Sequence, residues 1–312
     1  MYPHEAEVTE ATAGPPVTVR PMRLGDVERV IDLGSTALGG AYAAVGTTIP
    51  PLDAAARDDQ RTRLRGLLAA EPAGCHVAER AGDGADPSVV GVAMALRREG
   101  LWFLALLAVD PMVQATGVGA RLLAAAETTA VDATAGMLMS SVDPRALRRY
   151  WAAGFALEPT FSASGPVDRA LLAATPGIRD GDVDRDGDLV ADLDLQQRGY
   201  PHGPDIGRAV ELGSQLLVLD DGPARGYAVA GKQGLWALAA TDPPAAVRLL
   251  HAALAQAEGE QPVRVGWLSA RVPWALDTCL RTRLSVSAAS GALATRGELG
   301  PMTSYLPNGA RG

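Results

Sequence analysis

Residues 106–127 read LLAVDPMVQATGVGARLLAAAE, and this stretch decides the fold. An apolar run rich in Leu and Val ends at Asp110-Pro111, where we expect a strand to stop because proline cannot donate to a sheet ladder. An amphipathic run begins near Val118, so we expect a helix there. Between the two, Gly117 and Gly119 allow a tight turn whose backbone N–H groups converge at the positive end of the helix dipole. The stretch therefore predicts a strand, a turn and a helix that together bind a phosphate or a pyrophosphate.

The glycine pattern of this turn excludes two common phosphate sites. A dinucleotide fingerprint, G-x-G-x-x-G, requires a third glycine at a position that Leu122 occupies. A nucleotide P-loop ends in Gly-Lys-Ser or Gly-Lys-Thr, and this segment contains no lysine. The residues alone leave one other alternative, a glycine turn that binds nothing.

The turn does fit the pattern V-x-P-x-x-Q/R-x-x-G-x-G-x-x-L-L, which resembles the acetyl-CoA loop of the GNAT family of N-acetyltransferases. The positions of that pattern are held, in order, by Val109, Pro111, Gln114, Gly117, Gly119, Leu122 and Leu123. The resemblance implies that acetyl-CoA binds as a co-substrate and that a backbone N–H near Val109 polarises its thioester. The residues that it assigns to acetyl-CoA are Leu107, Val109, Gln114, Ala115, Thr116, Gly117, Val118, Gly119 and Ala120.

A second motif follows the loop and supports the same resemblance. Asp143-x-x-Ala146-x-x-x-Tyr150-x-x-x-Gly154-Phe155 is similar to the family pattern N-x-x-A-x-x-x-Y-x-x-x-G-F, with Asp143 in place of Asn. Spacings of three and four residues place Asp143, Ala146 and Tyr150 on one helical face. The resemblance implies that Tyr150 protonates the departing CoA thiolate and that Asp143 contributes to the acetyl-CoA site. The alternative for Tyr150 is a buried core aromatic.

The sequence does not identify a general base. Many GNAT members are expected to carry a glutamate on the strand before the loop, but residues 101–109 contain no acid. Glu99 lies just before that strand, Glu79 and His76 flank another strand, and none of them is assigned to the role. A water chain, or an amine that is already neutral when bound, would make a base unnecessary.

The order of predicted elements is that of an α/β fold with a mixed central sheet flanked by helices. Hydrophobic periodicity and the Gly and Pro positions predict strands at 17–20, 75–79, 89–96, 101–109, 137–141 and 156–164, and helices at 27–38, 54–68, 118–131 and 144–153.

The second half of the chain repeats landmarks of the first half. Three of them recur at separations of 135, 134 and 132 positions, namely Gly91-Val92-Ala93 as Gly226-Tyr227-Ala228, Gly100-Leu101-Trp102 as Gly234-Leu235-Trp236, and Asp110-Pro111 as Asp242-Pro243. Val19-Arg20 and Gly25-Asp26-Val27 also recur, as Ile178-Arg179 and Gly181-Asp182-Val183. We therefore expect tandem GNAT-like folds, with a flexible tail at 1–16, a domain with the acetyl-CoA site at 17–174 and a degenerate domain at 175–312.

The second copy lacks the features that the chemistry requires. Its turn is five residues shorter, and Pro243-Pro244 removes backbone N–H groups at the start of the helix. Cys279 stands at the position that corresponds to Tyr150. The two-copy layout also resembles that of the mycothiol synthase family, in which the second half holds the CoA site; here the first half is expected to hold it.

Composition limits the remaining possibilities. The chain has 312 residues, 47% of them hydrophobic, a formal net charge of −8 and two cysteines. The negative charge argues against a nucleic-acid partner and favours an amine substrate. No apolar run approaches the ~18 residues that span a bilayer, and the first residues do not resemble a signal peptide, so we expect a cytoplasmic protein without a membrane partner. The segment 182–187 begins like a calcium loop, but Leu193 holds its twelfth position, so we expect no metal site.

The function expected from these observations is transfer of an acetyl group from acetyl-CoA to an amine by direct attack. The acceptor is expected to be a small molecule rather than a protein, and the chain a monomer or a homodimer. Two other classes remain open, a catalytically silent acyl-CoA-binding or sensor protein and a purely structural tandem scaffold.

Overall fold

The computed structural model of the protein describes residues 16–81, 87–231, 234–257 and 262–309. The tail expected at 1–16 lies outside the described residues, except for Pro16. Within these ranges no helix is both long enough and apolar enough to cross a bilayer.

The described strands form one mixed sheet of thirteen strands, which confirms the α/β fold class and the mixed sheet. The first half contributes β1 (Val17–Pro21), β2 (Cys75–Arg80), β3 (Ser88–Arg98), β4 (Leu101–Val109), β5 (Ala135–Ser140) and β6 (Ala156–Gly165). The second half contributes β7 (Ile178–Asp180), β8 (Gln215–Asp221), β9 (Ala224–Gly231), β10 (Gly234–Ala240), β11 (Val263–Leu268), β12 (Ser285–Gly297) and β13 (Tyr305–Leu306).

Helices cover both faces of this sheet. In the first half they are α1 (Val27–Ala43), α2 (Ala54–Ala70), α3 (Val118–Glu127) and α4 (Pro144–Ala152). In the second half they are α5 (Val183–Gln197), α6 (Asp205–Glu211), α7 (Pro243–Ala255) and α8 (Pro273–Arg281). Successive side chains of a strand point to opposite faces, so β3 sends Val92 and Met94 into one core cluster and Ala93 and Ala95 into another.

One of these core clusters joins the two halves. It contains Val30 of α1 and Leu64 of α2 together with Leu193 of α5 and Ile206 of α6. The other two clusters lie under α3 in the first half and under α7 in the second half. The two halves therefore share a hydrophobic core as well as a sheet.

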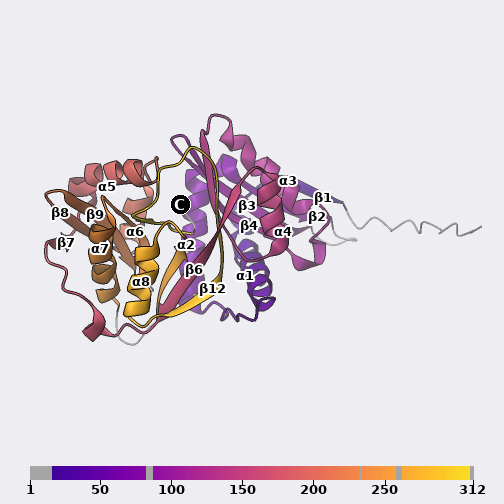
Figure 1. Cartoon of the computed structure of the whole chain (residues 1–312). Coiled ribbons are helices and arrows are strands. Elements are labelled where there is room, and N and C mark those ends of the chain that lie inside the picture. Colours follow the sequence, from indigo (N-terminus) through magenta and orange to yellow (C-terminus); the bar gives the residue numbers. More distant parts are fainter. Residues whose placement is uncertain (1–15, 82–86, 232–233, 258–261, 310–312) are drawn as a thin grey trace, which may run out of the picture.

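The strand order reads the same from both edges of the sheet. It runs β1-β2-β3-β4-β5-β12-β6-β11-β10-β9-β8-β7, so that β1–β6 and β7–β12 take equivalent places. The last strands of the two halves have changed places, because β12 pairs with β5 and β6 pairs with β11. Figure 1 shows β6 and β12 crossing the middle of the molecule between the two groups of helices. The sequence repeat gave no indication of this exchange.

Most predicted elements are present with shifted ends; α1, for example, continues past the predicted residue 38 to Ala43. The helix after the glycine turn ends at Glu127 and is followed by a 3₁₀ turn, Thr128–Ala130, rather than continuing to residue 131. The hydroxyls of Thr128 and Thr129 donate to the carbonyls of Ala125 and Ala126. Such side-chain hydrogen bonds compete with the helical ladder and favour its end.

Candidate functional site

The central feature of the site is the separation of β4 from β5. The two strands pair in parallel from Leu101 with Ala135 to Leu104 with Leu138, and β4 then continues to Val109 without β5. On the other side, β4 stays paired with β3 as far as Val109. The Asp110 N–H donates to the Val90 carbonyl, 2.8 Å away, so by strand alternation the backbone groups of Val109 and Leu107 face the gap left by β5.

The turn between β4 and α3 presents a run of unpaired backbone amides. Gly117 is the N-cap of α3, with a φ of 85° that a residue with a Cβ adopts only with strain. In the described part of the chain, no hydrogen bond uses the backbone N–H of any residue from 114 to 119 as its donor. These six consecutive free amides precede and begin a ten-residue helix, and free N–H groups at the positive end of a helix dipole favour an anion.

Three arginines of α4 add positive charge beside this turn. Arg145, Arg148 and Arg149 line a cavity of about 320 Å³ whose opposite wall is the free edge of β4. The guanidinium of Arg149 lies against Gly119, because a Cβ built on Gly119 would be 2.6 Å from Arg149 Cζ. These arginines were not predicted as site residues, although spacings of three and four residues on a predicted helix indicate a common face.

The sequence-predicted acetyl-CoA residues divide into two groups. Leu107, Val109, Gln114, Ala115 and Asp143 line the cavity. Thr116, Gly117, Val118, Gly119 and Ala120 do not line it, and the Val118 side chain belongs to the core under α3. The side chains of this second group therefore do not face the cavity, and only the backbone of the turn is left to contact a ligand there.

Two of the predicted side chains already have partners that shape the site. The Gln114 side-chain amide donates to the Val109 carbonyl at 2.9 Å, and it thereby ties the turn to the end of β4. The Thr116 hydroxyl donates to the Val113 carbonyl at 2.7 Å. Both contacts hold the turn in the conformation that leaves its amides free.

Asp143 acts as the N-cap of α4. Its carboxylate accepts from the Arg145 backbone N–H at 2.8 Å and pairs with the Arg145 guanidinium at 3.0 Å. Burial alone would raise the pKa of Asp143, but the hydrogen bonds from Arg145 hold that pKa below its ordinary value. A charged Asp143 thus fixes the start of α4, the helix that carries Tyr150 and the three arginines.

Tyr150 lies in a second, adjoining cavity of about 550 Å³. The two cavities share a wall made of Leu38, Leu106, Leu107, Ser141 and Ala146. The Tyr150 ring packs edge-on against Phe155 with centroids 6.4 Å apart, and no hydrogen bond of its hydroxyl occurs among the described residues. Burial raises the pKa of the Tyr150 phenol to about 12, against the lowering effect of Arg149, so the phenol remains a proton donor at neutral pH.

The equivalent place in the second half is filled by the chain itself. There the described residues of β10 and β11 pair only at Gly234 with Arg264, and β13 pairs with β10 beyond that point. Val109 pairs with Gly91, and Ala240 pairs with Gly226, the counterpart of Gly91 in the sequence repeat. Val109 and Ala240 therefore hold equivalent positions in the two halves. The Ala240 N–H, the counterpart of the free Val109 N–H, donates to Ser304.

The helix that follows β10 also differs from α3. α7 begins at Pro243, directly after its N-cap Asp242, whose carboxylate accepts the Ala245 N–H at 2.8 Å. No glycine turn separates β10 from α7. The positive end of α7 thus faces a carboxylate of this chain.

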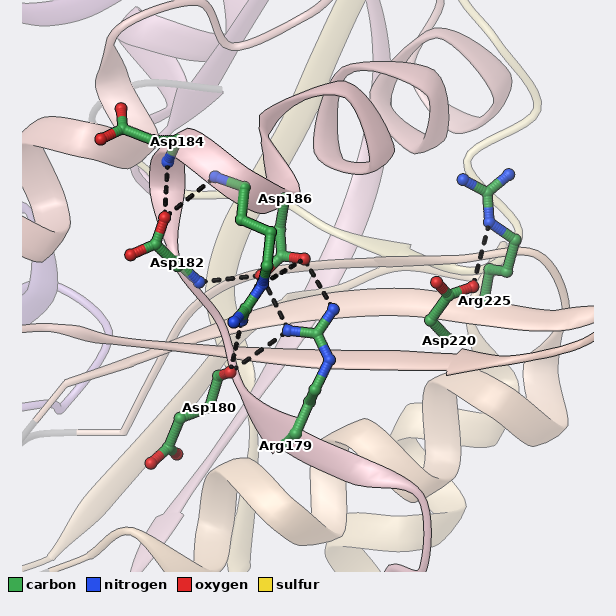
Figure 2. Close-up of polar contacts among 8 residues, drawn as sticks. Arg179, Asp180, Asp182, Asp184, Asp186, Asp220 and Arg225 are labelled. Carbon is green, nitrogen blue, oxygen red and sulfur yellow. Dashed lines mark hydrogen bonds and ion pairs between the residues drawn. The ribbon is translucent and has the colours of Figure 1, made fainter.

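The acidic segment 182–187, shown in Figure 2, is organised by arginines and backbone amides. Asp182 caps α5 by accepting from the N–H groups of Asp184 and Arg185, and Asp186 pairs with Arg179 at 2.6 Å. By these contacts Asp186, rather than Asp182, is the counterpart of Asp26, which pairs with Arg20 at 2.9 Å. The sequence alignment of Asp26 with Asp182 was wrong, because the turn in the second half is longer.

Throughout the described residues, no group of three or more His, Cys, Asp or Glu side chains is arranged to hold a metal ion.

The part of the chain that forms this site is similar to a known protein family. Residues 47–155 match the model of the acetyltransferase (GNAT) family, a range that contains β4, the glycine turn, α3 and Tyr150. No curated protein matches the sequence.

Solved structures show the same fold at low sequence identity. A protein of Pyrococcus horikoshii assigned as an acetyltransferase superposes with a TM-score of 0.75 at 16% identity, over 100% of this chain and 99% of that one. A GCN5-related N-acetyltransferase of Sphaerobacter thermophilus has a TM-score of 0.58 at 13% identity, over 90% of this chain and 95% of its own. A third, from Kribbella flavida, has a TM-score of 0.56 at 16% identity, over 90% of this chain and 72% of its own. Residues 47–155 thus match the GNAT acetyltransferase family, and the chain as a whole has the fold of these solved structures.

Proposed function

We propose that this protein transfers an acetyl group from acetyl-CoA to the amine of a small molecule, and that the first half holds the acetyl-CoA. The observation that carries the proposal is the run of six free amides at 114–119 beside the unpaired edge of β4. A pyrophosphate suits the amides and the arginines of α4, and an extended, amide-containing arm suits a free strand edge. CoA joins these two chemical features in one molecule.

The position of the thioester follows from this orientation. With its phosphates at the turn, CoA would extend along Leu107 and Val109 toward the cavity that contains Tyr150. The Val109 N–H faces the gap and would donate to the thioester carbonyl, stabilising the negative charge that develops there. The acceptor amine would enter from the 550 Å³ cavity, on the side of Tyr150.

The reaction needs one bond to form and one to break. The amine nitrogen attacks the carbonyl carbon, the carbon–sulfur bond breaks, and the sulfur takes the proton of the Tyr150 hydroxyl. Tyr150 recovers a proton from water as the amine nitrogen loses one. The described residues that line the 550 Å³ cavity include no carboxylate and no histidine, so the acceptor would bind as the neutral amine or lose its proton to water.

We further propose that the chain consists of a short tail at 1–16, an acetyl-CoA-binding domain at 17–174 and a degenerate domain at 175–312. The symmetric strand order supports two copies of one fold, and the pairing of β13 with β10 supports one acetyl-CoA site in the first copy. The exchange of β6 and β12 means that neither domain completes its sheet alone.

The direct test is release of free CoA thiol from acetyl-CoA in the presence of a panel of small amines, with the acetylated amine identified by mass. The proposal predicts amine-dependent release at a rate well above hydrolysis. Binding of acetyl-CoA without release by any amine would instead indicate a sensor. No binding of acetyl-CoA would contradict the site itself.

A further inference from the structure

The 550 Å³ cavity draws part of its wall from the second half of the chain. α1 and the segment after it, β4, β5 and α4 form the side next to Tyr150. The opposite side contains Ser162 and Ser164 of β6, Ser287 of β12, and Arg264 and Trp267 of β11. The strand exchange creates this wall, because it places β6 between β12 and β11.

The polar groups of that wall lie on one face of three neighbouring strands. Arg264 is directly opposite Ser164, and Ser287 is directly opposite Ser162. Since residues two apart on a strand share a face, all four side chains point to the same side of the sheet. They form a row of hydroxyls with a guanidinium at one end.

Arg264 is the one charged side chain among the described residues that line this cavity. It is exposed, and no ion pair or hydrogen bond of its guanidinium occurs in the described part of the chain. Arg271, which follows the same strand, in contrast pairs with Glu158 at 2.7 Å. The charge of Arg264 is therefore available to a ligand.

Trp267 gives the same wall an apolar surface. It has a φ of 59°, which is strained for a bulky side chain, and it lies where the register between β11 and β6 shifts, after Val265 and before Leu268. This irregularity changes the direction of the β11 side chains next to Arg264. The wall thus offers an aromatic surface, hydroxyls and one cation.

We propose that the acceptor amine carries an anionic group, a carboxylate or a phosphate, and that Arg264 of the second half binds it. This inference rests on the proposed acetyl transfer. Arg264 is then a specificity-determining residue, because a guanidinium binds either anion through two parallel hydrogen bonds. The described residues that line this cavity include no carboxylate. Since a nearby negative charge would favour the unreactive ammonium form of the amine, its absence favours the reactive neutral form.

The test compares matched acceptors in the full-length protein. One pair is an amino acid and its primary amide, and the other is O-phosphoethanolamine and ethanolamine, each assayed for kcat/KM by thiol release. We expect the anionic member of at least one pair to be preferred 10-fold or more, and the pair that shows this preference identifies the anion. In Arg264→Gln this preference should fall to less than 3-fold, while Arg264→Lys should retain part of it. The control is Arg281→Gln, which removes an exposed charge of α8 that pairs with Asp277.

Two results would overturn the inference, namely equal or better use of the neutral amines, and an unchanged preference in Arg264→Gln. Acetyl-CoA affinity, measured by calorimetry, should be the same in Arg264→Gln and wild type, which separates this inference from the acetyl-CoA site. If no amine of the panel is acetylated, acetyl transfer to this class of acceptor is contradicted. Binding then decides the role of Arg264: with CoA present, wild type should bind an N-acetyl amino acid at least 10-fold more tightly than its amide, and Arg264→Gln should not.

Discussion

The backbone N–H of Ala240 donates a hydrogen bond of 3.0 Å to the carbonyl oxygen of Ser304. Ala240 is the counterpart of Val109 by strand register, so the C-terminal segment covers in the second half the strand edge that is free in the first. Pairing of Leu238 with Leu306 extends this contact along β10. The two halves thus share a fold but differ in whether the edge of the fourth strand is open to a ligand.

Tyr150→Phe tests the proposed proton donor. The change keeps the ring and its packing on Phe155 but removes the hydroxyl, so turnover should fall roughly 10²-fold or more while acetyl-CoA affinity barely changes. Steady-state kinetics and calorimetry measure the two quantities. Because burial raises the pKa of Tyr150 to about 12, wild-type turnover should not decline through loss of this proton between pH 8 and pH 10.

Cys279→Ala is the matched control for Tyr150→Phe. Cys279 is buried in α8 at the position equivalent to Tyr150, and no thioester is expected to reach it. Its replacement should leave turnover almost unchanged. Equal losses in the two variants, or full activity of Tyr150→Phe without an ordered water within ~3 Å of the CoA sulfur, would remove Tyr150 from the mechanism.

Arg149→Gln tests whether the arginines of α4 contribute to phosphate binding. Loss of one charge-assisted hydrogen bond of about 1.5 kcal/mol should weaken acetyl-CoA binding by about 10-fold at low salt. The difference from wild type should shrink as ionic strength rises, since exposed charges are screened. Arg281→Gln serves as the charge control. An unchanged affinity for acetyl-CoA in Arg149→Gln would mean that Arg149 only packs against Gly119.

Asp186→Asn tests the arginine cluster of the second half. The hydrogen bond from Arg179 holds the pKa of Asp186 well below its usual range, although burial opposes this. A lowered pKa in the folded state stabilises the protein above the ordinary aspartate pKa of about 3.9, and this stabilisation is lost as the pH falls below that value. The variant should therefore lose about 1–3 kcal/mol of unfolding free energy at pH 7 and less below pH 4.

Urea unfolding of Asp186→Asn and of the control Asp188→Asn measures this difference. Asp188 is exposed, so its replacement should change the unfolding free energy by no more than about 0.5 kcal/mol. A loss that is equal at pH 7 and below pH 4 would show that the charge of Asp186 is not what stabilises the turn.

Local patterns in the sequence predicted the first half well. Pro111 marks the end of β4, and Gly117 marks the start of α3, because each residue imposes its own backbone restriction at that point. The nearly continuous burial of β3 likewise follows from its apolar composition. These are effects of neighbouring residues, which a sequence displays directly.

The pairing of strands that lie far apart in the sequence could not be predicted from such local patterns. Nothing in the residues of β6 or β12 distinguishes pairing within one half from pairing across the two, since both strands present similar edges. The contact of Arg149 with Gly119 and the place of Arg264 in the second cavity depend on that pairing and on helix docking. The covering of β10 by β13 was missed for the same reason, because two residues make too short a strand to recognise.

Calorimetric titration with acetyl-CoA tests most directly the claim that one site, in the first half, serves the whole chain. Wild type should bind one acetyl-CoA per chain, and Gly119→Trp should abolish binding because its side chain fills the space between the free amides and Arg149. Pro244→Trp, an exposed change at the start of the equivalent helix α7, should bind one acetyl-CoA as wild type does. Two equivalent sites per chain, or wild-type binding by Gly119→Trp, would contradict the account.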